Sequence, residues 1–271
     1  MAIKHDSVTE ESSLARSITT WRPENRAMLP VAGYHRARFG CIPCTQPVCA
    51  EDPMAKLYKF RRDDGSFDYD RYRATQIAAN KAKLDAVFAI KDNIGYLAER
   101  VLEIRGPCTF GLCHGTRRGL EQQWFSEFLN CTVIGTEISD TAVQFPNTIQ
   151  WDFHNVKDEW ISETDFIYSN SWDHSYEPRY CFDQWVKCLK PGGLMILEHS
   201  SRHLPSTVNP VDPFGASIDD LVRLLNSWGN GRYGVHQVIE TLPISTYDLA
   251  VSETVNHKVV DLRAVIVQKT N

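Results

Sequence analysis

The sequence of 271 residues has no long apolar run. No stretch approaches the roughly 20 consecutive apolar residues that a membrane-spanning helix needs, so we expect no membrane anchor. Residues 1–25 are polar and lack the apolar core of a secretory signal, which favours a cytoplasmic protein. In that compartment, eight cysteines indicate reduced thiols rather than a disulfide framework.

An excess of basic charge is also missing. The chain has 29 lysines and arginines against 34 aspartates and glutamates, and its formal net charge is -5. Nucleic-acid-binding proteins neutralise phosphates with clustered basic residues, whereas the basic residues here alternate with acidic ones. We therefore expect the protein to bind a small molecule rather than a nucleic acid. The protein itself is expected to be a monomer or a homo-oligomer.

The pattern that is present changes twice along the chain. Residues 1–67 form a polar tail and a Cys/Pro-rich extension. Residues 68–105 predict two helices of a lead-in or lid. Asp68 opens the first, whose apolar pattern continues to Phe88, and Asp92 is the expected N-cap of the second. Residues 106–271 then alternate short apolar runs with amphipathic stretches, and this segment is the expected catalytic domain.

The last segment predicts an α/β fold, a doubly wound seven-stranded sheet that is mostly parallel. Buried strands that alternate with helices are typical of a parallel sheet with helices on both faces. We interpret the last two strands as an antiparallel pair at the sheet edge. Strands are expected near 108–113, 132–137, 148–152, 164–169, 193–198, 235–242 and 259–268, helices near 118–129, 177–189 and 217–228, and a tight reversal at 190–193.

Ligands bind such a sheet beyond the carboxyl ends of its strands. Gly115 follows the first strand, where small residues let the backbone approach a ligand, ahead of a helix N-terminus. Glu137 ends the second strand, and a carboxylate there can accept hydrogen bonds from both hydroxyls of a ribose. Asp152 ends the third strand, at a place suited to an exocyclic amine.

These motifs, in this order and spacing, resemble the class I S-adenosylmethionine-dependent methyltransferases over about residues 107–200. The runs DFIYSNSWDHSYEP (165–178) and CLKPGGLMILEH (188–199) are similar to the family's fourth strand, following helix and fifth strand. The resemblance implies that S-adenosyl-L-methionine binds with its methionine part on the first loop, its ribose on Glu137 and its adenine near Asp152. The cofactor-binding residues it implies are Cys113, His114, Gly115, Thr116, Arg117, Glu137, Ile138, Asp152, Phe153, Ser169 and Asn170.

The first loop departs from the family's usual pattern, which is acid-x-Gly-x-Gly-x-Gly. Gly111 occupies the acidic position, Cys113 the first glycine and Arg117 the third, so that Gly115 alone is retained. The missing acid is a common partner of the cofactor's ammonium group, and Arg117 is a candidate for binding the cofactor carboxylate or an anionic substrate. The substitutes left open for the acid are His114, Asp173 and a backbone carbonyl.

Methyl transfer to a hydroxyl requires removal of a proton, and a histidine titrates near neutral pH. His174, which lies between Asp173 and Tyr176 after the fourth strand, is the expected general base; the alternative is that it stacks on the cofactor or caps a helix. Asp173 belongs to the same expected catalytic set. His199 is the second candidate for the base, and a structural hydrogen bond is its alternative. The acceptor pocket is expected to include Trp172, Tyr176, His203, Gln76, Asn80 and the rigid turn at 209–217, which ends in a candidate N-cap, Ser217.

The N-terminal extension contains a weak metal candidate. His35, Cys41, Cys44 and Cys49 offer four zinc ligands, but a zinc signature normally has a second pair at a characteristic spacing. We therefore expect reduced thiols here and no metal site.

The sequence thus predicts transfer of a methyl group from S-adenosyl-L-methionine to a small polar acceptor, most simply a sugar-like or other metabolite hydroxyl. Two alternatives belong to other functional classes. One is a cofactor-binding protein of the same fold without transfer activity, which the altered first loop suggests. The other is a nicotinamide-dependent oxidoreductase. The absence of a G-x-G-x-x-G motif after the first strand argues against it.

Overall fold

The computed structural model describes residues 55–241 and 262–270, and its centre is a seven-stranded sheet. The strands are β2 (Phe110–His114), β3 (Thr132–Glu137), β4 (Thr148–Gln150), β5 (Thr164–Ser169), β6 (Leu189–His199), β8 (Tyr233–Glu240) and β9 (Arg263–Lys269). They lie in the order β4-β3-β2-β5-β6-β9-β8. Neighbours from β4 to β6 pair in parallel, while β9 pairs antiparallel with both β6 and β8, which confirms the predicted architecture.

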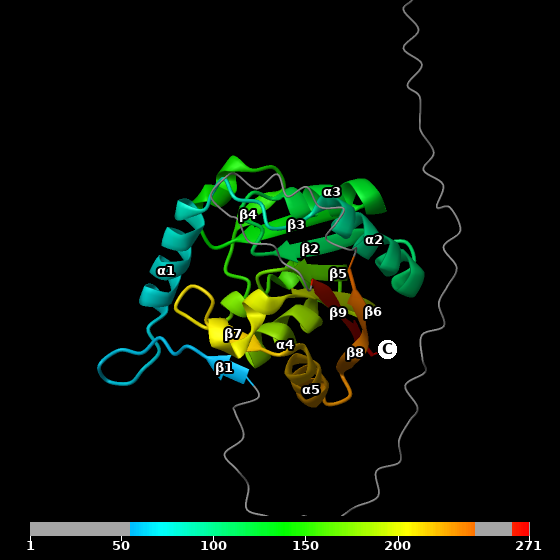
Figure 1. Ribbon diagram of the computed structural model, residues 1–271. Coiled ribbons are helices and arrows are strands. Elements are labelled where there is room, and N and C mark those ends of the chain that lie inside the picture. The colour runs from blue at the N-terminus through cyan, green and yellow to red at the C-terminus, as the bar shows by residue number, and fades with distance from the viewer. Residues whose placement is uncertain (1–54, 242–261, 271) are drawn as a thin grey trace, which may run out of the picture. The chain divides into compact units, whose positions relative to one another are not determined.

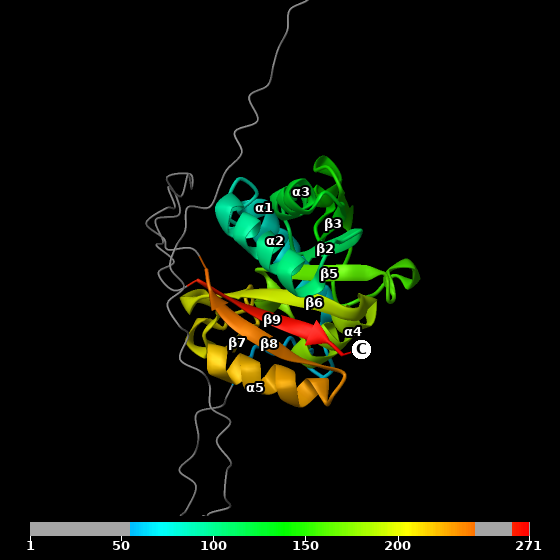
Figure 2. The same cartoon turned by 90° about the vertical axis from the view of Figure 1, so that its right-hand side faces the viewer.

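Helices cover both faces of the sheet (Figure 2), as the doubly wound prediction requires. Alternate side chains of β6 enter two separate core clusters, because successive residues of a strand point to opposite faces. Leu194 and Ile196 pack with α2 and α3, and Met195 and Leu197 pack with α4 and α5. The four helices are α2 (Lys91–Arg105), α3 (Leu120–Leu129), α4 (Pro178–Cys188) and α5 (Ile218–Gly229).

A further helix, α1 (Tyr69–Ala82), lies beside the carboxyl ends of the neighbouring strands β2, β3 and β4 (Figure 1). It begins as predicted, because the Asp68 carboxylate accepts a hydrogen bond from the Arg71 N–H at 3.0 Å. A small antiparallel sheet pairs β1 (Ala55–Leu57) with β7 (Phe214–Ala216). None of the helices in residues 55–241 and 262–270 is both long and apolar enough to cross a membrane.

Two helix boundaries differ from the prediction. The pattern that continues to Phe88 suggests a longer helix, but α1 ends at Ala82, and the Phe88 ring lies instead between the guanidinium groups of Arg117 and Arg202 at 4.9 and 5.5 Å. The second helix begins one residue before Asp92, and Ile90 is its N-cap. Tertiary contacts of the connecting segment therefore override the apolar periodicity.

The tight reversal predicted at 190–193 takes the form of a bulge within β6 rather than a turn ahead of the strand, and Gly192 has a positive φ of 72° there. These residues belong to β6 and form an irregularity in its pairing, since Thr164 pairs with Leu189 whereas Phe166 pairs with Leu194. The Lys190 ammonium donates to the buried Asp165 carboxylate at 3.1 Å, which holds the segment against the sheet.

Candidate active site

A cavity opens where the carboxyl ends of β2, β3, β4 and β5 meet α1. It encloses about 540 Å³ of space, its open mouth included. Nine of the predicted site residues line it: Gln76, Asn80, Gly115, Arg117, Glu137, Ile138, Asp152, Phe153 and His174. Tyr72, Ala79, Lys83, Ser171 and Val211 also line it and were not predicted individually.

Glu137 ends β3 and is one of the buried walls of this cavity. Its Oε1 accepts a hydrogen bond from the Ser139 N–H at 2.9 Å, and its Oε2 accepts one from the Arg117 N–H at 3.2 Å. Burial raises the pKa of Glu137, while the hydrogen bonds from Ser139 and Arg117 and the charge of Arg117 oppose that shift. The carboxylate is therefore held in one orientation, with acceptor capacity left on each oxygen.

The first loop bends sharply at Gly115, whose φ is +75°. A Cβ at this position would lie 2.8 Å from the Ser171 Cβ, so only glycine fits. Arg117 also has a positive φ, 42°, although the family resemblance places a glycine there. Its Nη1 donates to the Ala86 carbonyl at 3.2 Å, and its Nε is buried without a hydrogen-bond partner among the described residues.

The acid missing at Gly111 has a structural explanation. The Phe166 ring of β5 lies directly against Gly111, and a Cβ there would be 2.3 Å from a ring atom. An acidic side chain at this position is therefore excluded by packing. His114 cannot supply the negative charge of the missing acid, since an imidazole is neutral or positive. Burial lowers its pKa to about 3, and its Nδ1 lies 2.8 Å from the Thr136 hydroxyl.

Asp152 faces the cavity with both carboxylate oxygens already engaged. Its Oδ1 accepts from His154 Nδ1 at 2.7 Å and its Oδ2 from the Tyr69 hydroxyl at 2.8 Å. Burial alone would raise the pKa of Asp152, but the hydrogen bonds from His154 and Tyr69 outweigh it and hold the pKa below its usual range. An adenine amine would therefore share Asp152 with a tyrosine of α1.

His174 lies in a short 3-10 turn after β5, and its orientation is fixed by α1. Its Nδ1 is 2.8 Å from the Gln76 Oε1. The Gln76 amide nitrogen donates to the Val211 carbonyl at 2.9 Å, so the Gln76 oxygen faces His174 and must accept from an Nδ1–H. The second ring nitrogen, Nε2, lies 3.4 Å from Asp212 Oδ1.

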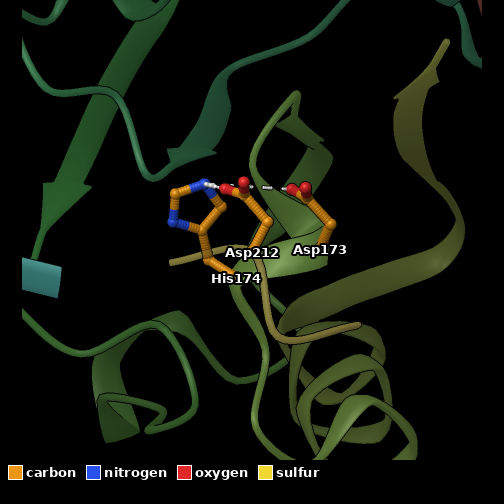
Figure 3. Close-up of side chains that lie close together, drawn as sticks. All are labelled: Asp173, His174 and Asp212. Carbon is orange, nitrogen blue, oxygen red and sulfur yellow. Dashed lines mark ion pairs between the residues drawn. The ribbon is translucent and has the colours of Figure 1, made fainter. Parts of the chain in front are cut away.

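Asp173, His174 and Asp212 form a compact cluster (Figure 3), and their ligand-type atoms all lie within 4.8 Å of one another. Of the three, His174 lines the cavity. Burial raises the pKa of Asp173 to about 7, although the nearby His174 lowers it. Asp173 Oδ1 is buried and has no hydrogen-bond partner among the described residues. Asp212 was not predicted individually; it lies in the turn at 209–217, whose Ser217 is the N-cap of α5 as predicted.

Several predicted catalytic or acceptor-pocket residues do not line the cavity. Trp172 is fully buried, and its indole N–H donates to the Glu198 carbonyl. His199 Nε2 is 2.9 Å from the Ala216 carbonyl, and His203 Nδ1 accepts from the Ser200 N–H at 2.9 Å. The Tyr176 ring stacks on His154 at 3.8 Å. Their contacts are those of packing and hydrogen bonding within the fold, which residue type and position after a strand do not distinguish from a pocket.

The five predicted cofactor-binding residues that do not line the main cavity divide into two groups. Cys113, His114 and Ser169 are buried within the strands, and the Ser169 hydroxyl donates to the His114 carbonyl at 3.0 Å. Thr116 and Asn170 line a neighbouring cavity that shares Gly115 and Arg117 with the main one.

The weak zinc candidate His35, Cys41, Cys44 and Cys49 lies outside the described residues.

No family model matches the sequence, and no curated protein matches it either. Similarity is found among solved structures. A 1,6-didemethyltoxoflavin-N1-methyltransferase of Burkholderia thailandensis, crystallised with 1,6-didemethyltoxoflavin and S-adenosylhomocysteine, is similar with a TM-score of 0.55 at 10% identity, over 78% of this chain and 94% of that one.

Two further structures share the fold. The [4+2]-cyclase SpnF has a TM-score of 0.51 at 10% identity, over 79% of this chain and 98% of the cyclase. A chain in the complex of the Haloferax volcanii Trm112 methyltransferase activator with a putative methyltransferase has a TM-score of 0.50 at 13% identity, over 76% of this chain and 99% of that one. With its strand order and antiparallel β9, this chain has the fold of the class I S-adenosylmethionine-dependent methyltransferases.

Proposed function

We propose that this protein transfers a methyl group from S-adenosyl-L-methionine to a hydroxyl of a small polar acceptor, such as a sugar-like metabolite. One observation carries the proposal: a single cavity contains both Glu137 and His174. Glu137 ends the strand where the resemblance places the cofactor ribose. His174 follows the strand beside which the acceptor is expected, so the two reactants would meet in one space.

The residues present fit this cofactor. Gly115 forms a cradle that any side chain would fill, and the buried Thr116 hydroxyl next to it has no hydrogen-bond partner among the described residues. Gly115 and Thr116 would hold the methionine part, Glu137 the ribose hydroxyls, and Asp152 with Phe153 the adenine. When bound, the cofactor supplies an electrophilic methyl group on a sulfonium.

The acceptor side of the cavity is polar. Gln76, Asn80 and Lys83 come from α1 and its C-cap, and His174 faces them from the end of β5. Such a lining favours an acceptor with several hydrogen-bonding groups over an apolar one. Because α1 covers the cavity, it would also keep water away from the reacting atoms.

A second function of the same fold deserves a test. The similar [4+2]-cyclase shows that the fold by itself does not determine the reaction. The altered first loop, with Arg117 in place of a glycine, also motivates the alternative of a cofactor-binding protein without transfer activity.

The first experiment is calorimetric titration of the full chain with S-adenosylhomocysteine, with NADH titrated in parallel. We expect binding of S-adenosylhomocysteine and none of NADH. Glu137→Ala should weaken the binding by about 1–3 kcal/mol, which corresponds to roughly 5- to 150-fold in Kd, because hydrogen bonds to a buried charged group are lost. Lys81→Ala, which removes an exposed ion pair with Asp140, is the matched control.

Equal binding of S-adenosylhomocysteine by wild type and Glu137→Ala would remove Glu137 from the site. Binding of NADH alone would replace the proposal with the oxidoreductase alternative. Where the cofactor binds, a screen of sugars and polyols for release of S-adenosylhomocysteine from S-adenosylmethionine separates a transferase from a binding protein.

A further inference from the structure

The cluster of Asp173, His174 and Asp212 brings two carboxylates and one imidazole nitrogen within 4.8 Å of one another. The hydrogen bond to Gln76 places a proton on His174 Nδ1, so that Nε2, which carries the lone pair when the ring is neutral, points toward the two carboxylates. Figure 3 shows the three side chains in a row, with the carboxylates on the Nε2 side of the ring. Lone pairs and negative charges that converge in this way are stabilised by a positive charge between them.

The spacing suits a metal ion better than direct hydrogen bonds. Nε2 of His174 is 3.4 Å from Asp212 Oδ1 and 3.9 Å from Asp173 Oδ1, both longer than a normal hydrogen bond. Two ligand atoms that are each about 2.1 Å from one ion lie at most about 4.2 Å apart. Both distances are within that limit. The third separation, between the two carboxylates, is at most 4.8 Å. The Asp212 side chain is 32% exposed and can move to shorten it.

A second observation points to a ligand. The Asp173 side chain is only 6% exposed, and its Oδ1, the atom nearest His174, is buried without a hydrogen-bond partner among the described residues. The other nearby nitrogen, His203 Nε2, is 3.8 Å away and faces the Asn170 carbonyl at 3.3 Å. A buried carboxylate oxygen without a partner is costly, and coordination would satisfy it.

We propose that Asp173, His174 and Asp212 bind a divalent cation of the manganese, iron or zinc type. One imidazole nitrogen and two carboxylates favour these ions over calcium and magnesium, which prefer oxygen ligands alone. The predicted general base His174 is then a ligand.

A role for this ion in catalysis rests on the proposed function, whereas the site itself does not. His174 lines the cavity, and three protein ligands leave positions open for an acceptor hydroxyl. A hydroxyl bound to the cation has a lowered pKa and loses its proton to water. Its oxygen then forms the bond to the methyl carbon as the sulfur–carbon bond breaks, which releases S-adenosylhomocysteine.

The test uses the full chain, freed of metal with a chelator and titrated with Mn²⁺ while free Mn²⁺ is followed by electron paramagnetic resonance. Mn²⁺ is the probe because thiols, including those at residues 41, 44 and 49, prefer softer ions. We expect one site per chain, with affinity lowered at least 10-fold in Asp212→Asn and in Asp173→Asn. The exposed Asp219→Asn, in the first turn of α5, should bind as wild type does.

A measurement on the wild-type protein covers the case in which a variant does not fold. Pulsed resonance of bound Mn²⁺ should show coupling to an imidazole nitrogen, and its absence would overturn the assignment of His174. Failure of the metal-free wild type to bind Mn²⁺, or unchanged binding in both aspartate variants, would overturn the site. S-adenosylhomocysteine binding without Mn²⁺ binding would leave the proposed function standing, and the reverse result would leave only the cation site.

Discussion

The two helices ahead of β2 follow each other in the chain and bury opposite kinds of side chain. α1 buries Gln76 and Asn80 beside Tyr72, and all three line the cavity. α2 buries Ile94, Leu97, Ala98 and Val101 against α3 and the sheet. Apolar burial stabilises a fold without regard to direction, whereas buried amides act through oriented hydrogen bonds.

The difference indicates a division of labour. α2 belongs to the core on which the sheet depends. α1 is fastened to the site by specific contacts: Gln76 with His174, the Asn80 carbonyl oxygen with Thr141 at 2.8 Å, and Tyr69 with Asp152. Substitutions in α2 should therefore affect stability, and substitutions in α1 should affect the site.

The largest effect is expected for Leu97→Ala in α2. Leu97 is completely buried, and the cavity left by truncation should lower the free energy of unfolding by about 2–5 kcal/mol. Urea denaturation measures this change. Leu102→Ala, on the exposed side of the same helix, is the control and should stay within about 0.5 kcal/mol of wild type. A small effect at Leu97 would place α2 outside the cooperative core.

One polar contact between α2 and the sheet, from Asn93 to Glu198, allows a second test of the role of α2 in stability. Glu198 of β6 is buried against Asn93, and burial raises the pKa of Glu198 to about 7. Because the folded state then favours the protonated acid, Glu198 costs stability progressively as pH rises from about 4.5 to about 7. Glu198→Gln should therefore stabilise the protein by about 1–3 kcal/mol at pH 8 and have almost no effect near pH 4.5.

Chemical denaturation at the two pH values measures the effect of Glu198→Gln. Glu99→Gln, on the exposed side of α2, is the control and should show no such pH dependence. A gain that is the same at both pH values would show that packing, rather than charge, is responsible.

The smallest change in stability is expected for Gln76→Ala in α1. Loss of the hydrogen bonds to His174 and Val211 should lower the free energy of unfolding by about 1 kcal/mol. The Mn²⁺ affinity should nevertheless fall about 10- to 100-fold, because a partner that orients a ligand is removed. Lys81→Ala, with its exposed ion pair, controls for α1. A loss as large as that of Leu97→Ala would contradict the division between the helices.

The fold was predictable to a large extent, because apolar runs bounded by turns and helix patterns are local signals. The strand positions and the edge pair agree with the structure. A reversal at 190–193 was predictable, but its place inside β6 was not, since it follows from the pairing of β6 with the distant β5. The place of Phe88 beyond the end of α1, where its ring contacts Arg117 and Arg202, was likewise not predictable from the local pattern.

The candidate site was predictable only in part. Gly115, Glu137 and Asp152 follow strands in an order that the resemblance identifies, and all three line the cavity. Trp172, Tyr176, His199 and His203 lie in equally polar stretches, yet their side chains are satisfied within the fold. Whether a side chain faces a cavity or a carbonyl depends on neighbours that are distant in sequence.

The sequence by itself determined the class of fold and the edge of the sheet where a ligand would bind, because periodicity and the residues after each strand are local properties. Only the tertiary structure decided that Asp212, 38 residues beyond His174, completes a cluster with it and Asp173, and that Gln76 sets the tautomer of His174 from the opposite side. These contacts join segments that no local pattern connects, and they exist only once α1 and the turn at 209–217 pack over the carboxyl ends of the strands.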